Sequence, residues 1–144
     1  MKHKVNLTIK VMTTINPTED AAKVIQAVRN LFPELELRIE DNIVVAEGKG
    51  KKHLEKIRNY LWQQRVLDAA RQYILKHTFS DMIILKLNKQ AALAGKVCFC
   101  DTDEESPMGS IQVIVETDNP ELVVDWLAPP TSYGKPIKQV ELED

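Results

Sequence analysis

The polar cluster Asn88-Lys89-Gln90 brings together the side chains in this 144-residue sequence that are best suited to binding chemistry. Two amides and an ammonium group can hydrogen-bond phosphate oxygens, 2′-hydroxyls or base edges, which is the chemistry of RNA recognition. The same side chains can equally stabilise a tight turn between strands. The cluster leaves both interpretations open.

A second candidate is the segment Gly48-Lys49-Gly50-Lys51, which is followed by Lys52. It does not match the nucleotide phosphate loop, because that loop needs four residues between its glycines and Ser or Thr after its lysine. We interpret the segment as a basic entrance to a helix. The exposed amides of a helix start can still contact one backbone phosphate.

The other reactive residue types do not have the spacing that catalysis or metal binding requires. His3, His53 and His77 are far apart and share no ligand spacing. The serines lack the context of a nucleophile elbow. We therefore expect no enzymatic activity and no cofactor.

The two cysteines and the acidic run 101–105 give little support for a metal site. On a strand, Cys98 and Cys100 would point to opposite faces, and no second cysteine pair completes a zinc site. The acidic run matches no calcium loop, so it is either a solvated loop or a place for a hard cation. We expect no bound metal.

The distribution of charge is more informative than the net charge of −2. Between Lys49 and Lys76, eight cations stand against two acids, a net charge of +6. From Cys98 to Asp144, two cations stand against eleven acids, a net charge of −9. Such asymmetry focuses an anionic ligand onto one face if folding keeps the cations together. Otherwise the basic stretch is a pair of ordinary solvated helices.

The composition is that of a globular domain, with 44% hydrophobic and 28% charged residues. The longest apolar runs, such as residues 82–85, are too short to span a bilayer. Polar residues interrupt the N-terminal segment, so it lacks the apolar core of a secretion signal. We expect a cytoplasmic protein.

Hydrophobic periodicity predicts the elements of the N-terminal half. Residues 5–11 alternate as a half-buried strand, and residues 35–48 read as a hairpin that turns at Asp41-Asn42. Asn16 and Glu19 predict a capped helix start, and Pro33 ends that helix. The apolar face of the helical region 51–77 changes side near residues 62–65. This change predicts two helices, or one sharply bent helix.

The C-terminal half predicts further strands at residues 82–87, 97–100 and 111–115, with a loop or helical turn at 88–94. A helix follows Asn119-Pro120 and includes Trp126, which we expect in the core. The predicted fold is a single α+β domain of about six mostly antiparallel strands, with helices packed on one face. Residues 1–128 form its folded core. Residues 129–144 form a polar tail that can add an edge strand.

Several short sequence segments resemble those of an archaeal family, uncharacterised protein family two hundred and one. The most specific are Asn88-Lys89-Gln90-Ala91-Ala92 and Trp126-Leu127-Ala128-Pro129. The segments are residues 16–20, 64–71, 87–92, 107–111 and 125–131. The resemblance implies a fold similar to that of large-subunit ribosomal protein five. It also implies RNA binding, a homodimer and an association with RNA-processing machinery, but no catalytic residues.

The leading hypothesis is therefore an RNA-binding protein. The residues predicted to contact RNA are Lys49, Lys51, Lys52, Lys56, Arg58, Arg65, Arg71, Asn88, Lys89, Gln90 and Lys96. The alternative is a protein-interaction or dimeric scaffold subunit, which would use the edge strand of the tail or Trp62 as its contact.

Overall fold

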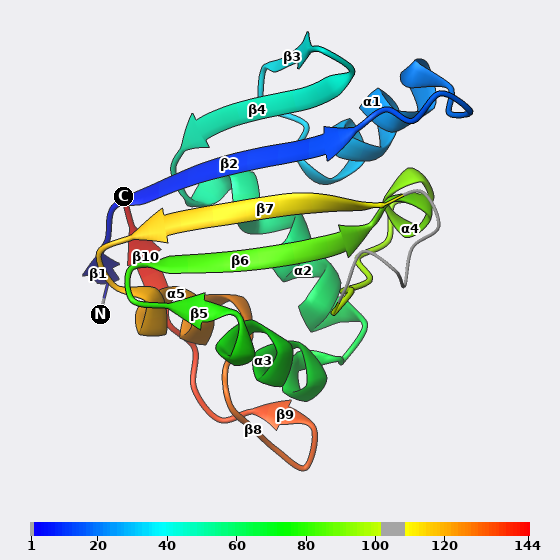
Figure 1. The fold of residues 1–144 in the computed structure, drawn as a ribbon. Helices are drawn as coiled ribbons and strands as arrows, with labels where there is room; N and C mark the ends of the chain where they lie inside the picture. The colour runs from blue at the N-terminus through cyan, green and yellow to red at the C-terminus, as the bar shows by residue number, and fades with distance from the viewer. Residues whose placement is uncertain (1, 102–108) are drawn as a thin grey trace.

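A six-stranded antiparallel sheet is the central element of the computed structural model, which describes residues 2–101 and 109–144. The strand order is β3-β4-β2-β7-β6-β5, and the helices lie behind one face (Figure 1). Within the described residues, this arrangement confirms the predicted α+β class. The main strands are β2 (Leu7–Thr14), β3 (Leu37–Glu40), β4 (Ile43–Lys49), β5 (Thr78–Phe79), β6 (Met82–Asn88) and β7 (Ser110–Thr117).

Helices connect these strands and bury their apolar faces against the back of the sheet. They are α1 (Ala21–Leu31), the short 3₁₀ helix η1 (Lys51–Leu54), α2 (Glu55–Gln63), α3 (Leu67–Lys76), α4 (Lys89–Leu93) and α5 (Pro120–Leu127). Trp126 of α5 is 5% exposed and belongs to the core, as predicted. No helix in the part of the chain that the structure describes is long and apolar enough to cross a membrane.

Alternation along each strand separates a buried face of the sheet from an open one. On β2, Leu7, Ile9 and Val11 are buried against the helices, whereas Lys10 and Met12 point away and are exposed. A period of two residues is the expected pattern when one face of an antiparallel sheet meets the core. The buried face fixes the register of the strands. A shift in pairing by one residue would point the core side chains toward solvent.

Two local predictions from the sequence are confirmed in detail. Asp41 and Asn42 have φ values of 49° and 63° and join β3 to β4 in a two-residue hairpin, which is the conformation that such turns demand. Arg65 has a φ of 57° and separates α2 from α3. The change of apolar side at residues 62–65 therefore marks a real break between two helices.

The predicted start of the first helix is wrong by four residues. Glu19 does accept from the Asn16 backbone N–H at 2.9 Å, as a capping box requires, but these residues form a turn ahead of the helix. The cap is Asp20, whose side chain accepts from the Ala22 N–H at 2.9 Å. Both residues are good caps, and the chain uses the second.

The predicted strand at residues 97–100 is also wrong, because this segment makes only one isolated bridge, between Phe99 and Leu87. Cys98 is exposed and Cys100 buried, and both are free thiols. The acidic run falls mostly on residues 102–108, which lie outside the described part of the chain.

The tail returns to the other end of the chain. Residues 131–132 (β8) and 135–136 (β9) form a small hairpin, and β10 (Glu141–Glu143) pairs in parallel with β1 (Lys2–Lys4). The extra strand thus exists but adds to β1, and not to the main sheet. Leu142 of β10 is 1% exposed and packs in the core.

Candidate nucleic-acid interface

The loop from β4 into η1 is shaped by its two glycines. A Cβ on Gly48 would lie 2.5 Å from Leu35 Cδ2 and 2.7 Å from His53 Nε2, so only glycine lets these side chains pack. Gly50 has a φ of 106°, a conformation that favours glycine. The loop therefore turns sharply and presents the first amides of a helix, which have no acceptor within that helix.

Three of the predicted lysines, Lys49, Lys51 and Lys52, surround this helix start, and a fourth, Lys56, follows in α2. Lys49, Lys52 and Lys56 are exposed, and Lys51 is half-buried because its Nζ donates to the Leu142 carbonyl. Lys49, Lys51 and Lys52 line a hollow of about 530 Å³ that also contains Asp144. One of the predicted groups of cations is thus brought together by the fold.

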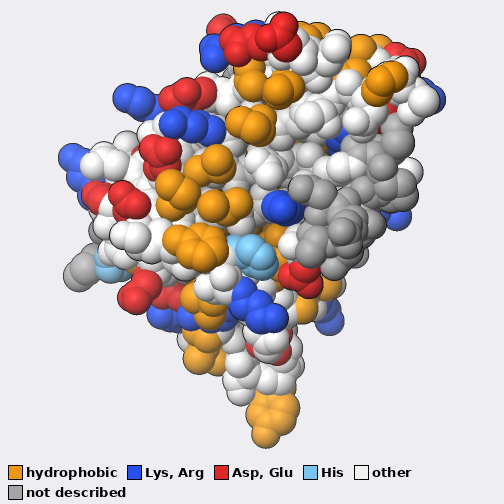
Figure 2. Space-filling model, in the orientation of Figure 1, with side chains coloured by type: hydrophobic (Ala, Val, Ile, Leu, Met, Phe, Trp, Pro, Cys, Tyr) orange, Lys and Arg blue, Asp and Glu red, His pale blue; other side chains and the backbone are white. Residues whose placement is uncertain are grey.

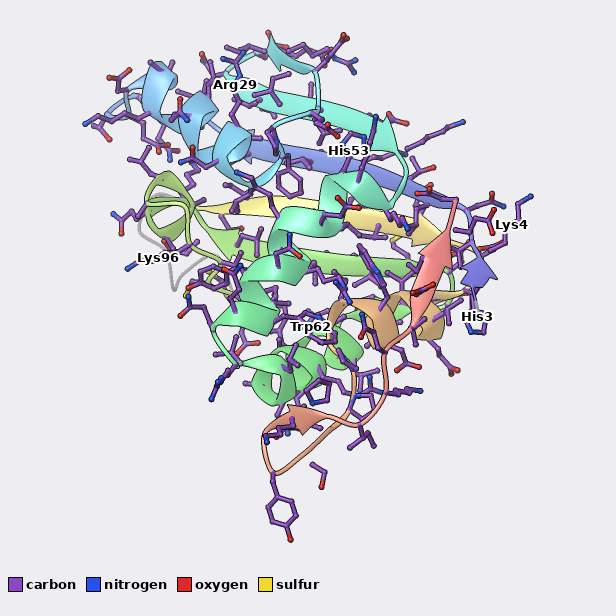
Figure 3. All side chains as sticks on the ribbon, turned by 180° about the vertical axis from the view of Figure 1, so that it is seen from behind. His3, Lys4, Arg29, His53, Trp62 and Lys96 are labelled. Atoms are coloured by element: carbon purple, nitrogen blue, oxygen red, sulfur yellow. The ribbon has the colours of Figure 1, made fainter. Side chains whose placement is uncertain are left out.

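Lys96 lies on the side of the molecule that the helices cover. Lys56 lines a second hollow of about 350 Å³ together with Tyr60 and Gly95, the neighbour of Lys96. Figure 3 views the molecule from this side and shows Lys96 beside α4, with His53 at the start of η1. Lys96 is exposed. We call Lys49, Lys51, Lys52, Lys56 and Lys96 the α2 basic surface.

Arg58 and Arg71 point inward instead. The Arg58 guanidinium lies 4.5 Å from the Trp62 ring centroid and 5.2 Å from that of Trp126, and its Nε donates to the Trp126 carbonyl at 2.8 Å. Arg71 donates to Asp125 at 2.7 Å. Both arginines connect α5 to the preceding helices. Trp62 packs in the same cluster.

Asp125 is the charge partner that holds Arg71 in this position. Burial raises the pKa of this carboxyl, but hydrogen bonds from Lys138, at 2.9 Å, and Arg71 outweigh burial and lower its pKa below the ordinary value. A charged, hydrogen-bonded carboxylate keeps Arg71 engaged at neutral pH. Arg71 is consequently less available to RNA than the exposed lysines.

The Asn88-Lys89-Gln90 cluster was expected either to contact RNA or to stabilise a tight turn, and its residues differ in this respect. The Asn88 side chain caps α4 by accepting from the Ala91 N–H at 2.9 Å. Lys89 is 4% exposed, and its Nζ donates to the Thr14 carbonyl at 2.6 Å and to Glu19 at 2.8 Å. Lys89 cannot contact RNA without giving up these bonds, and the Oδ1 of Asn88 is engaged in the helix cap.

Two predicted residues remain exposed but lie apart from the helix start. Gln90 lines a hollow of about 300 Å³ together with Lys23 and Glu19. Arg65 lies in the turn between α2 and α3. The structure therefore brings three of the eleven predicted residues, Lys49, Lys51 and Lys52, into one hollow. Lys56 and Lys96 are exposed farther along the helical side, and the other six predicted residues are dispersed or buried.

His53 lies beneath the helix start. It is 5% exposed, and its Nδ1 has no hydrogen-bond partner among the residues that the structure describes. Burial lowers the pKa of His53, and Lys52 lowers it further, while Glu34 and Asp144 act in the opposite direction. The imidazole is therefore neutral at neutral pH and acts as a packing group beneath the lysines.

The residue that sequence reasoning missed is Asp144. Its carboxylate accepts a hydrogen bond from the Lys51 backbone N–H and lies 3.0 Å from where a Cβ on Gly50 would be. The signal was present in the sequence as the contrast between a basic middle and an acidic end. What the sequence could not show is that the acidic end reaches the basic loop.

Comparison with known proteins identifies the family. A family model described as RNA binding matches residues 8–117. The UPF0201 protein of Sulfurisphaera tokodaii is 42% identical over 127 residues, which cover 85% of this chain and 88% of that protein. The chain belongs to the UPF0201 family. Its relative in Sulfolobus acidocaldarius is 40% identical over 131 residues, covering 88% of this chain and 90% of the relative.

Solved structures of the UPF0201 family share the fold. One crystal structure of a UPF0201 protein has a TM-score of 0.76 and 34% identity, and covers 90% of this chain and 99% of its own. The UPF0201 protein of Methanococcus jannaschii has a TM-score of 0.74 and 32% identity, covering 92% of this chain and 99% of its own. The resemblance found in the sequence is thus confirmed at the level of family and fold.

Proposed function

We propose that the protein binds RNA through the α2 basic surface and acts as a binding module, not as an enzyme. The observation that carries the proposal is that Lys49, Lys52, Lys56 and Lys96 are exposed on one side and make no ion pair within the part of the chain that the structure describes. The match of residues 8–117 to a model described as RNA binding supports the same proposal.

The chemistry of lysine determines what kind of binding this surface can give. An ammonium group is a point charge that contacts phosphate oxygens, and phosphate contacts position a protein on RNA without reading its sequence. Each phosphate that is neutralised releases counterions, so affinity falls as salt rises. We therefore expect affinity for structured RNA with weak sequence preference and strong dependence on ionic strength.

The test is the affinity for a structured RNA across a range of salt concentrations. Four phosphate contacts predict that log affinity falls with log salt at a slope of about −3. Replacing Lys49, Lys52 and Lys56 together with Gln should reduce the affinity about tenfold at low salt and make that slope shallower. Lys51 is left in place because its bond to Leu142 supports the fold.

A matched variant separates these contacts from overall charge. Arg38, Lys76 and Lys135 are exposed cations outside the α2 basic surface, so replacing all three with Gln removes the same charge. This control should keep most of the affinity and nearly the full slope. Equal loss in the two variants, or no salt-sensitive binding by the wild type, would refute the proposal.

A second function is favoured by the open face of the sheet. Figure 2 shows hydrophobic side chains gathered over the middle of this face; Met12 is 41% exposed and Phe79 is 52% exposed. Ile84 and Ile114 lie between them, on neighbouring strands, and are only partly covered. Contiguous apolar surface of this kind marks protein contacts.

We infer that a second copy of this chain covers the open face, which gives a homodimer with both α2 basic surfaces outward. The exposed Lys10–Glu116 pair, 3.2 Å apart, provides both signs of charge beside the patch, as a self-complementary contact requires. Sedimentation of wild type and a Met12→Lys variant tests this inference. A wild type that sediments as a monomer at all concentrations would contradict it.

A further inference from the structure

Arg58 is held in one orientation by two tryptophans and a backbone hydrogen bond. Its guanidinium lies 4.5 Å from the Trp62 ring centroid and 5.2 Å from that of Trp126, and its Nε donates to the Trp126 carbonyl at 2.8 Å. Figure 3 shows Trp62 beside α5, on the side of the molecule that the helices cover. A guanidinium fixed in this way presents its Nη1 and Nη2 groups as a preformed pair of donors, which we call the Arg58 fork.

The Arg58 fork has no acceptor in the part of the chain that the structure describes. Nε is the only donor of Arg58 that makes a hydrogen bond there, and the residue makes no ion pair. Arg58 is half-buried, and burial lowers its pKa, while Glu55 acts in the opposite direction. Polar groups that are withdrawn from water are ordinarily paired, because an unpaired charge is costly there. The two Nη groups thus lack a partner that a ligand can supply.

The hollow beside the Arg58 fork carries balanced charges. Its volume is about 410 Å³, and it is lined by two cations, Lys51 and Arg58, and by two carboxylates, Glu55 and Glu141. The Lys51 ammonium is already engaged, since it donates to the Leu142 carbonyl. A phosphate would meet both carboxylates in this hollow. Charge therefore favours a neutral ligand that offers acceptors to the Arg58 fork and donors to a carboxylate.

Guanine has this combination of groups. Its O6 and N7 lie side by side and accept both donors of an arginine, which is the commonest specific contact between a side chain and a base. Its N1–H and N2–H groups donate, and a carboxylate is a matching acceptor for them. Adenine presents a donor next to its N7, so it cannot accept twice from the Arg58 fork. In double-stranded RNA the first edge lies in a groove too narrow for side chains and the second is paired, so the base has to be unpaired.

We propose that the hollow beside Arg58 binds one unpaired guanine, which accepts from the Arg58 fork and donates to Glu55 or Glu141. This chemistry is shared by an unpaired guanine of RNA and by a free guanine nucleotide. The inference rests on the proposed function only for the first of these sources. It adds a preference for one base to the phosphate contacts of the α2 basic surface, which read no sequence.

The first experiment titrates the full chain with nucleoside monophosphates and follows the indole N–H resonances by NMR. The chain contains two tryptophans, and both lie against Arg58, so the two resonances report on the hollow. GMP and AMP carry the same ribose phosphate and differ only in the base. A bidentate contact predicts that GMP shifts these resonances at about tenfold lower concentration than AMP, CMP or UMP.

Two variants test the groups that would contact the base. Arg58→Lys keeps the charge but removes the fork, so GMP should bind no better than AMP. Glu55→Gln combined with Glu141→Gln removes the charged acceptors, which should reduce the preference for GMP over AMP about fivefold. The matched control is Glu36→Gln combined with Glu143→Gln, because both acids are exposed and neither lines the hollow. This control should keep the full preference, and unfolding curves check that each variant is folded.

The second experiment compares two hairpin RNAs that differ at one loop position, which is guanine in one and adenine in the other. At one salt concentration the wild type should bind the guanine RNA about fivefold more tightly, and Arg58→Lys should abolish the difference. The dependence of affinity on salt should be the same for both RNAs, since they contain the same phosphates.

The outcomes separate this inference from the proposed function. If RNA binds with the expected salt dependence but guanine and adenine behave alike in both experiments, the guanine site is refuted and RNA binding stands. If RNA does not bind but GMP shifts the indole resonances at the lower concentration, the proposed function fails and the site stands for free guanine nucleotides.

Two further results would also refute the guanine site. One is that CMP or inorganic phosphate shifts the indole resonances as readily as GMP. The other is that the double variant at Glu55 and Glu141 keeps the full preference for GMP, a result that decides the matter even if Arg58→Lys does not fold.

Discussion

Replacing Glu19 with Gln should destabilise the protein strongly, because it leaves the Lys89 charge buried without a counter-charge. Lys89 is 4% exposed and Glu19 10% exposed, and their atoms lie 2.8 Å apart. Breaking one side of a buried ion pair costs about 3–5 kcal/mol. We expect about 3 kcal/mol, since the Gln oxygen can still accept from Lys89 and Asn16.

This loss is large compared with a typical domain stability of about 5–15 kcal/mol. For a chain of this size it should lower Tm by about 10 °C. Chemical denaturation followed by circular dichroism measures the free energy of unfolding. The matched control is Arg38→Gln: Arg38 pairs with Glu40 at 2.8 Å, but the side chains are 69% and 59% exposed. That variant should lose less than about 1 kcal/mol.

The dependence on pH gives a further check on the same pair. Burial raises the pKa of Glu19, but bonds from Lys89 and Asn16 outweigh burial, so its net pKa lies below the ordinary 4.5. The ionised carboxylate therefore stabilises the folded state fully above pH 4.5, and this contribution is lost as pH falls through the lowered pKa. The gap between wild type and Glu19→Gln should be constant near neutrality and shrink in acid. A gap below about 1 kcal/mol at pH 7 would refute the reasoning.

Three other substitutions test the surroundings of the α2 basic surface. Leu142→Ala should lower the free energy of unfolding by about 2–4 kcal/mol, because it empties a fully buried position; a loss similar to that of an exposed site would contradict the packing of β10. Gly48→Ala should cost about 1–3 kcal/mol in the same denaturation assay, since its Cβ would overlap Leu35 and His53; unchanged stability would show that they move aside. Asp144→Asn should lower the pKa of His53 further in an NMR titration, because the Asp144 charge raises it; an unchanged pKa would contradict their proximity.

Local sequence signals were enough where the conformation depends on adjacent residues. The Asp41-Asn42 turn and the break at Arg65 each follow from a few neighbouring side chains, and both were predicted. The start of α1 was predicted wrongly because Asn16 and Asp20 can both cap a helix, and local pattern does not choose between them. The strand expected at residues 97–100 failed because the segment pairs with β6 only around Phe99, through the Cys98 carbonyl and the Cys100 N–H, and this single bridge does not extend into a ladder within the described residues.

The site was harder to predict, because burial of a charge depends on partners distant in sequence. Lys89 is 70 residues from Glu19, and Arg71 is 54 residues from Asp125. In the sequence all of these cations look equally available for RNA. Lys49, Lys52 and Lys56 stay exposed and form no ion pair with any residue that the structure describes, a fact that only the fold provides. The basic run indicated where exposed lysines occur, but not which of its cations the fold would bury or pair.

The pairing of β1 with β10 has a consequence for how the chain folds. Residues 2–4 and 141–143 meet on one side of the molecule, although nearly the whole chain separates them (Figure 1). Contacts between such distant segments carry a large entropic cost of loop closure and form late. During synthesis the first strand must wait for residues 141–143 to leave the ribosome. Until then Leu142 is missing from the core, so a nascent chain holds the six-stranded sheet in an incompletely stabilised form.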